Sequence, residues 1–181
     1  EFSMGHGRQI NIEIKDKEIS IRDFGRGIPF GFDAQGNNTL DSAASKLHTG
    51  GKFDSKNFQK SVGMNGVGLK AANALSSSFV IQSVRDGETL RIEYCKGKRV
   101  TENLDVEPTR EKNGTYVSFV PDDTLFEPYQ YNFDYIETML RNYAYLNVGL
   151  RLTFNGQEFK SENGLLDLLN ESMESDPLYD P

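Results

Sequence analysis

The sequence predicts an α+β fold, a two-layer sandwich of strands and helices. Three observations carry this prediction. Short stretches of alternating apolar and polar residues recur along the chain, a few stretches of helical period separate them, and long loops rich in glycine and asparagine join them. The 181 residues suit one compact domain, and a hydrophobic content of 36% can supply its core.

The first thirty residues predict a β-hairpin. Isoleucine alternates with polar residues over 10–14, residues 15–17 form a polar turn, and the alternation resumes at Ile19 and Ile21. A break rich in glycine and proline follows at 25–31. This segment therefore gives two paired strands that end in a loop.

Residues 33–65 predict a long loop with one short helix at Leu40–Leu47. A loop of this length is uncommon inside a compact domain and is usually functional, as a lid or a binding segment. Gly66–Leu75 is a better helix, because its apolar residues recur at helical spacing.

The second half of the chain continues the same alternation of strands and helices. An amphipathic helix runs from Phe133 to Ala144, and the Asn155-Gly156 pair predicts a hairpin turn. The remaining predicted elements are strands at Phe79–Val84, Leu90–Tyr94, Thr115–Val120, Leu150–Phe154 and Gln157–Phe159, a short helix beginning at Leu165–Leu169, and a linker at 171–181.

Composition excludes several classes of protein. A formal charge of −7 argues against a domain that grips nucleic acid by itself, since that usually needs a basic face. No apolar run is long enough to cross a bilayer. Cys95 alone cannot form an internal disulfide and fits a reducing cytosol, and one cysteine with His6 and His48 cannot build a typical zinc site.

Strand parity indicates a pocket. Asp23 lies on the same face of its strand as Ile21, so an apolar row ends in a carboxylate, and Thr115 begins a similar row that includes Val117. Two such rows suit the floor of a pocket for a flat, mostly apolar ligand. The alternative is that both polar residues are ordinary strand ends that meet loops.

The glycine-rich segment Gly63–Gly68 leads into the 66–75 helix, which suits phosphate binding, and Lys52 could add a positive charge. The alternative is a flexible hinge. Familiar nucleotide motifs fail here, because no GK[ST] sequence is present for a P-loop and no strand precedes the glycines as a dinucleotide fold requires. Asp23-Phe24-Gly25 spells the kinase DFG, but no HRD motif precedes it.

The motifs resemble those of the GHKL (Bergerat-fold) ATPases, specifically the ATPase subunits of bacterial type II DNA topoisomerases. Asp23–Pro29 is similar to their D-x-G-R-G-I-P box, and Leu47–Phe53, Gly63–Ser76 and Gly114–Asp122 extend the match in the same order. The resemblance implies a GHKL ATP-binding domain over 1–170, lacking its N-terminal helix, and a linker at 171–181 toward an absent transducer domain. It also implies that the sandwich is a mixed, mostly antiparallel sheet with helices on one face. Ser61–Asn65 favours the topoisomerase IV side of the family over the gyrase side.

The resemblance also implies roles for individual residues. Asp23 would accept a hydrogen bond from the adenine amino group with support from Thr115, and Arg26 and Arg85 would edge the pocket, where ATP-competitive inhibitors reach. The full set expected to bind ATP is Ile21, Asp23, Arg26, Gly27, Ile28, Pro29, Lys52, Gly63, Met64, Asn65, Gly66, Val67, Gly68, Leu69, Arg85, Thr115 and Val117.

In this family a helix before the first strand carries the Glu that activates water and the Asn that holds Mg²⁺. Both positions would lie upstream of Glu1, so no catalytic or metal residue is expected within the 181 residues. Glu1 itself is expected to pair with Arg26. The chain is therefore expected to bind ATP, which with Mg²⁺ is the cofactor of the family, but to hydrolyse it poorly.

The resemblance implies partners as well. DNA would be held by other domains of the full-length protein. ATP binding would bring together two copies of the ATPase subunit, which would form a heterotetramer with an A-type subunit. The resemblance implies a cytoplasmic protein with no membrane partner. Two alternatives stay open. One is a GHKL ATPase of the Hsp90 or MutL type, which the Leu47–Phe53 and Gly114–Asp122 boxes oppose, and the other is a ligand-binding module without hydrolysis.

Overall fold

A computed structural model of the chain describes residues 1–46, 67–126 and 128–173. The strands in this part form one nine-stranded sheet in the order β5-β4-β3-β7-β2-β1-β8-β9, with β6 paired to β4. The strands are β1 (Gln9–Lys15), β2 (Glu18–Asp23), β3 (Ser76–Arg85), β4 (Glu88–Cys95), β5 (Lys98–Arg99), β6 (Glu107–Pro108), β7 (Gly114–Pro121), β8 (Arg151–Phe154) and β9 (Gln157–Phe159). The helices are a 3₁₀ turn at Phe2–Met4, α1 (Thr39–Ser45), α2 (Gly68–Ala74), α3 (Phe133–Leu146) and α4 (Leu165–Ser172).

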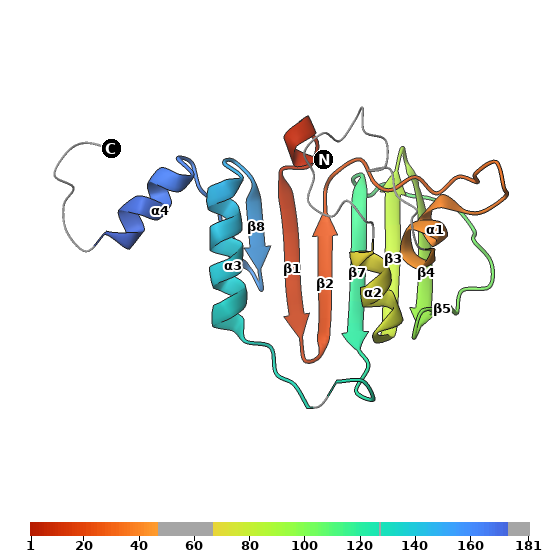
Figure 1. Cartoon of the computed structure of the whole chain (residues 1–181). Helices are drawn as coiled ribbons and strands as arrows, with labels where there is room; N and C mark the ends of the chain where they lie inside the picture. The colour runs from red at the N-terminus through yellow and green to blue at the C-terminus, as the bar shows by residue number, and fades with distance from the viewer. Residues whose placement is uncertain (47–66, 127, 174–181) are drawn as a thin grey trace.

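Helices α1, α2 and α3 lie on the same side of the sheet (Figure 1). All strand pairs are antiparallel except β1 with β8, which run parallel. The predicted two-layer α+β architecture, with a mostly antiparallel sheet, is confirmed.

The core is divided into two clusters along the sheet. The first cluster joins α1 to β3 and β4 through buried residues such as Leu40, Phe79 and Ile92. The second cluster lies near the other end of the sheet, where Ala144 of α3 packs with Leu152 and Phe154 of β8. Strands β2 and β7 lie between these two helix-covered regions.

Most predicted elements are present with shifted ends. The predicted 40–47 helix is α1 at Thr39–Ser45, because the Asn38 side chain caps its first turn by accepting from the Leu40 and Asp41 amides at 3.0 and 3.2 Å. The hairpin turn at Asn155-Gly156 is confirmed, with both residues at positive φ of 47° and 88°. Helix α2 begins at Gly68, whereas Gly66 lies outside the described residues.

The amphipathic helix predicted from Phe133 to Ala144 is also present as α3, with part of its apolar face exposed. Ala144 is buried, and Ile136 and Leu140 pack against the second cluster. Phe133 and Tyr143 are 45% and 53% exposed, although the Phe133 ring still packs edge-on against Phe154 of β8, with 5.5 Å between the ring centroids.

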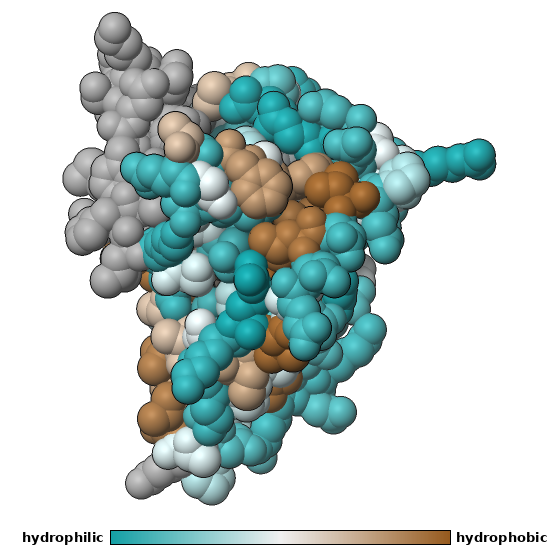
Figure 2. All heavy atoms as spheres, turned by 90° about the vertical axis from the view of Figure 1, so that its right-hand side faces the viewer, coloured by the Kyte–Doolittle hydropathy of each residue, from teal (hydrophilic) through white to brown (hydrophobic). Residues whose placement is uncertain are grey.

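From the side of β4 and β5, the described surface is mainly hydrophilic, with apolar atoms gathered in small groups (Figure 2). Among the described helices, none combines the length and the apolar composition that a bilayer crossing requires.

Candidate functional site

The candidate site lies where β2 ends, β7 begins and β3 ends. Ile21 of β2 pairs with Val117 of β7, which on its other side pairs with Ile81 of β3. Thr115 pairs with Ser83, two residues closer to the start of β7. The two rows predicted from parity are therefore neighbours in one sheet and face the helix layer.

Asp23 is the last residue of β2, and only one of its two carboxylate oxygens accepts a hydrogen bond within the described residues. Its Oδ1 accepts a hydrogen bond from the Gly25 amide at 2.8 Å, which fixes the side chain at the start of the loop. Within the described part of the chain, no donor bonds Oδ2. A half-buried carboxylate oxygen without a protein donor is an acceptor for a ligand N–H.

Asp23 also contacts β7 through its backbone. A Cβ added to Gly114 would lie 2.1 Å from the Asp23 carbonyl oxygen, so the start of β7 can approach β2 this closely only as glycine. No direct hydrogen bond joins Thr115 to Asp23 among the described contacts, and the supporting role expected of Thr115 stays a prediction.

The loop after β2 is fastened over the end of β3. The Ser83 hydroxyl donates to the Ile28 carbonyl at 2.6 Å, and Arg85 Nη1 donates to the Gly27 carbonyl at 3.3 Å. Gly27 has φ of 78°, and a Cβ there would lie 2.3 Å from the Val84 carbonyl oxygen. Glycine at this position lets the loop form one wall of the site.

The floor of the site is apolar and incompletely covered. Ile21 faces the helix layer and yet is 37% exposed. Ile28, Leu69 and Val117 pack only partly buried against the first cluster. An uncovered apolar strip beside a free carboxylate oxygen suits a flat heteroaromatic ring that carries an N–H donor.

Arg26 lies at the rim and pairs with Glu1, as expected. Its Nε and Nη2 donate to the two Glu1 carboxylate oxygens at 3.0 and 2.9 Å. These side-chain hydrogen bonds from Arg26 lower the pKa of Glu1 to about 2. A carboxylate with so low a pKa is a weak proton acceptor, so Glu1 does not suit the role of general base.

Part of the expected phosphate-binding set lies outside the described residues. It consists of Lys52, Gly63, Met64, Asn65 and Gly66.

The remaining expected residues lie around the site. Val67 and Gly68 are exposed at the start of α2, and Pro29 is exposed on the loop after β2. Arg85 lies at the rim, where its Nε is 3.3 Å from Asp86.

Two structural residues of the site were missed in the sequence. Ser83 is fully buried, and its position among the apolar residues of β3 was the available signal. Asn73 is 1% exposed and donates from Nδ2 to the Ala44 carbonyl at 3.0 Å, which ties α2 to α1. Both residues hold the walls of the site in place.

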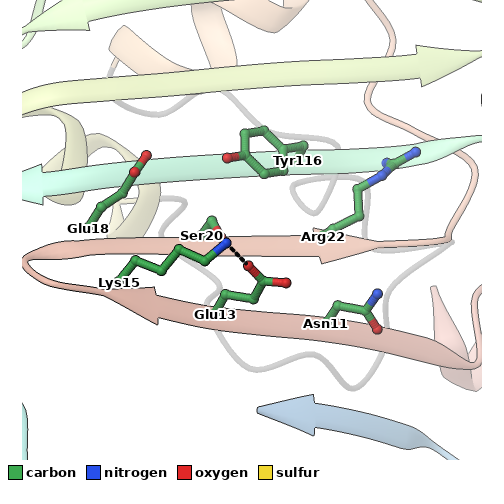
Figure 3. A pocket seen from close by; sticks show the side chains of 7 residues that line it. All are labelled: Asn11, Glu13, Lys15, Glu18, Ser20, Arg22 and Tyr116. Atoms are coloured by element: carbon green, nitrogen blue, oxygen red, sulfur yellow. Dashed lines mark ion pairs between the residues drawn. The ribbon is translucent and has the colours of Figure 1, made fainter. Parts of the chain in front are cut away.

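A separate trough of about 250 Å³ lies on the sheet strands β1, β2 and β7, away from these residues. Figure 3 shows its polar lining, in which Lys15 and Glu13 pair at 2.8 Å. Its mixed charges are those of a solvated sheet face and do not suit an adenine ring. No group of three or more potential metal ligands occurs among the described His, Cys, Asp and Glu residues.

Comparison with curated proteins finds relatives over almost the whole chain. The topoisomerase 4 B subunit of Borreliella burgdorferi is 44% identical over 99% of this chain, and the Mycoplasma capricolum protein of the same name is 36% identical over 94%. The DNA gyrase B subunit of Mycoplasmoides gallisepticum is 34% identical over 96%. The chain spans only 28–29% of the length of these three relatives.

Among solved structures, the 43K ATPase domain of Thermus thermophilus gyrase B, in complex with an aminocoumarin, aligns with a TM-score of 0.82 at 29% identity. The alignment covers 99% of this chain and 48% of that one. No family model matches the chain.

Proposed function

We propose that this chain, which belongs to the family of B subunits of bacterial type II DNA topoisomerases, is the ATP-binding module of such an enzyme. It has the fold of the gyrase B ATPase domain, and its relatives carry the names of topoisomerase 4 and gyrase B subunits. The higher identity to the topoisomerase 4 relatives supports the topoisomerase IV side of the family.

The observation that supports ATP best is the divided use of the Asp23 carboxylate. Oδ1 is held by the Gly25 amide, while Oδ2 remains an acceptor at the end of the apolar Ile21–Val117 floor. The adenine amino group is a donor of the required kind. Guanine carries a carbonyl oxygen at the corresponding place, which an acceptor repels.

The roles proposed for the other site residues follow from placing the adenine amino group at Asp23. Ile21, Leu69 and Val117 would contact the faces and edge of the ring, and the loop from Gly27 to Pro29 would line the side toward the ribose. Lys52 and the segment from Gly63 to Gly68 would cover the triphosphate. Magnesium, when bound with ATP, would neutralise phosphate charge.

We expect the 181-residue chain alone to bind ATP and to turn it over slowly. The Glu1 carboxylate is engaged by Arg26, and its low pKa makes it a poor base. In the whole protein we propose that ATP binding closes a dimer of B subunits, that an A-type subunit completes the enzyme, and that other domains perform DNA strand passage.

A titration calorimetry experiment tests the proposed specificity. A non-hydrolysable ATP analogue should bind saturably to the chain, and the matching GTP analogue should bind at least about tenfold more weakly, because one base presents a donor and the other an acceptor to Asp23. Equal affinity for both analogues, or no saturable binding of either, would contradict the proposal.

A further inference from the structure

A second cavity, of about 590 Å³, lies where β1 and β8 begin. Gln9 and Arg151 pair there in parallel register, and Phe24 follows the end of β2. Its lining consists of Arg8, Gln9, Phe24, Lys112, Gly149, Arg151 and Lys160. None of these residues belongs to the candidate nucleotide site.

The cavity is basic although the chain carries a net charge of −7. Four of the seven lining residues are cationic, and none is acidic. Three segments supply these cations, because Arg151 and Lys160 both belong to the β8–β9 hairpin while Arg8 and Lys112 are distant from it in sequence, so the fold gathers them. This local charge is opposite in sign to that of the whole domain.

Two of the four cations have no acidic partner. Among the described residues, Arg8 and Lys112 form no ion pair, and both are exposed. Arg151 pairs with Glu158 at 3.2 Å, and Lys160 pairs with Glu162, but exposed ion pairs of this kind contribute little energy.

An aromatic ring backs the cationic rim. The Arg22 guanidinium lies 5.2 Å from the centroid of Phe24, and its Nη2 donates to the Lys112 carbonyl at 2.6 Å. These contacts connect the lining residues Phe24 and Lys112 through Arg22. The backbone at Lys112 is therefore anchored to the end of β2 beside Phe24.

We propose that this cavity binds the phosphodiester backbone of double-stranded DNA. Clustered arginine and lysine side chains without an acidic neighbour in the lining match successive phosphates, which carry no sequence information. The choice of DNA over an acidic protein rests on the proposed function, because a topoisomerase module works beside a duplex. This binding would be weak and steeply dependent on salt.

Fluorescence anisotropy of a short labelled duplex with the 181-residue chain at low ionic strength tests the proposal. The wild-type chain should bind saturably. The double variant Arg8→Glu/Lys112→Glu should bind at least about tenfold more weakly, and the slope of log K against log salt should fall by about 2. The control Arg91→Glu/Lys98→Glu makes the same charge change on β4 and β5, far across the sheet, and should retain most of the wild-type affinity.

Two further measurements separate this proposal from the nucleotide site. The ATP analogue should bind Arg8→Glu/Lys112→Glu normally, which also shows that this variant is folded, and Asp23→Asn should lose analogue affinity while keeping duplex affinity. The proposal is overturned if the wild-type chain does not bind duplex, if the control variant loses as much affinity, or if polyglutamate binds as tightly as DNA.

Discussion

At the scale of single residues, the candidate site depends on glycines that allow backbones to meet. Gly27 and Gly114 would each place a Cβ within 2.3 Å of a carbonyl oxygen on a neighbouring strand, and both have a positive φ, of 78° and 146°. Gly36, with φ of 80°, has nothing within 4 Å of its Cβ position. Gly27 and Gly36 therefore share a positive φ, and they differ in whether a Cβ would collide with a neighbouring backbone.

Gly27→Ala should consequently destabilise the chain more than Gly36→Ala. At both positions alanine adopts a left-handed conformation, which costs about 1–2 kcal/mol. At Gly27 the collision with Val84 should bring the total to about 3 kcal/mol or more. Urea unfolding of both variants measures the difference, and equal losses would show that the Gly27 loop does not press on β3.

The pairing of Glu1 with Arg26 and the position of Asp23 were predictable at this scale, because both belong to a recognisable motif. The commitment of one Asp23 oxygen to Gly25 was not predictable, since it depends on the path of the loop. Ser83 was missed for a similar reason. Its partner is a carbonyl 55 residues away, which no local pattern shows.

At the scale of elements, α1 is set by its cap and borders the site through the loop before it. Asn38 is 4% exposed, accepts from two amides of α1 and donates to the Phe30 carbonyl at 2.7 Å. One side chain thus starts the helix and holds the loop that follows Pro29.

Asn38→Ala should therefore cost more than an ordinary cap. Loss of the cap costs about 1 kcal/mol, and the partly buried Phe30 carbonyl left without its donor brings the total to about 2–3 kcal/mol. Asn132→Ala is the matched control, because Asn132 is exposed and caps α3 by accepting only from Tyr135. Chemical denaturation compares the two, and similar losses would rule out the second role of Asn38.

Helix α4 is held at its start by Asp167, whose carboxylate accepts from Ser161, Glu162 and Asn163. These hydrogen bonds lower the pKa of Asp167 from the usual 3.8 to about 2, and the bond from Ser161 has the largest effect. Because the folded-state pKa is depressed, this contribution to stability is present above pH 3.8 and is lost as the pH falls toward 2.

Carbon NMR titration of the Asp167 carboxyl should give a pKa of about 2. Ser161→Ala should move the pKa upward, because it removes the leading bond. Ser172→Ala, at the other end of α4, should leave it unchanged. A pKa of 3.8 in the wild-type chain would contradict this account of the start of the helix.

The strands of the sheet were largely predictable, since alternation with one covered face is a strong local signal. The two-residue strands β5 and β6 were not, because so short a strand has no period to detect. Neither was the parallel pairing of β1 with β8, which joins residues about 140 positions apart. Pairing at that distance depends on how the whole chain packs.

At the scale of the whole molecule, the site lies between two cores that share one sheet. The first cluster holds the β3–β4 side and the second holds the β1–β8 side, while Ile21 of β2 stays 37% exposed between them. A ligand seated on this strip would contact Ile21 together with Val117 and Leu69, which pack against the first cluster. It should stabilise the fold as one unit by mass action.

This linkage gives a prediction for the whole chain. The non-hydrolysable ATP analogue, at about one hundred times its Kd, should raise the free energy of unfolding by about 2.7 kcal/mol. Thermal unfolding with and without the analogue measures the shift. An unchanged melting temperature at saturation would show that the analogue binds without engaging the folded site.

The central claim is that Asp23 reads the adenine amino group, and the Kd of the ATP analogue for Asp23→Asn tests it most directly. If the asparagine oxygen keeps the Gly25 bond, its amide presents a donor where the adenine donor needs an acceptor, so affinity should fall by about 1–3 kcal/mol, roughly 5- to 150-fold. Asp16→Asn, which makes the same change at the exposed turn of the same hairpin, should bind like the wild-type chain. Wild-type affinity in a folded Asp23→Asn variant would contradict the claim.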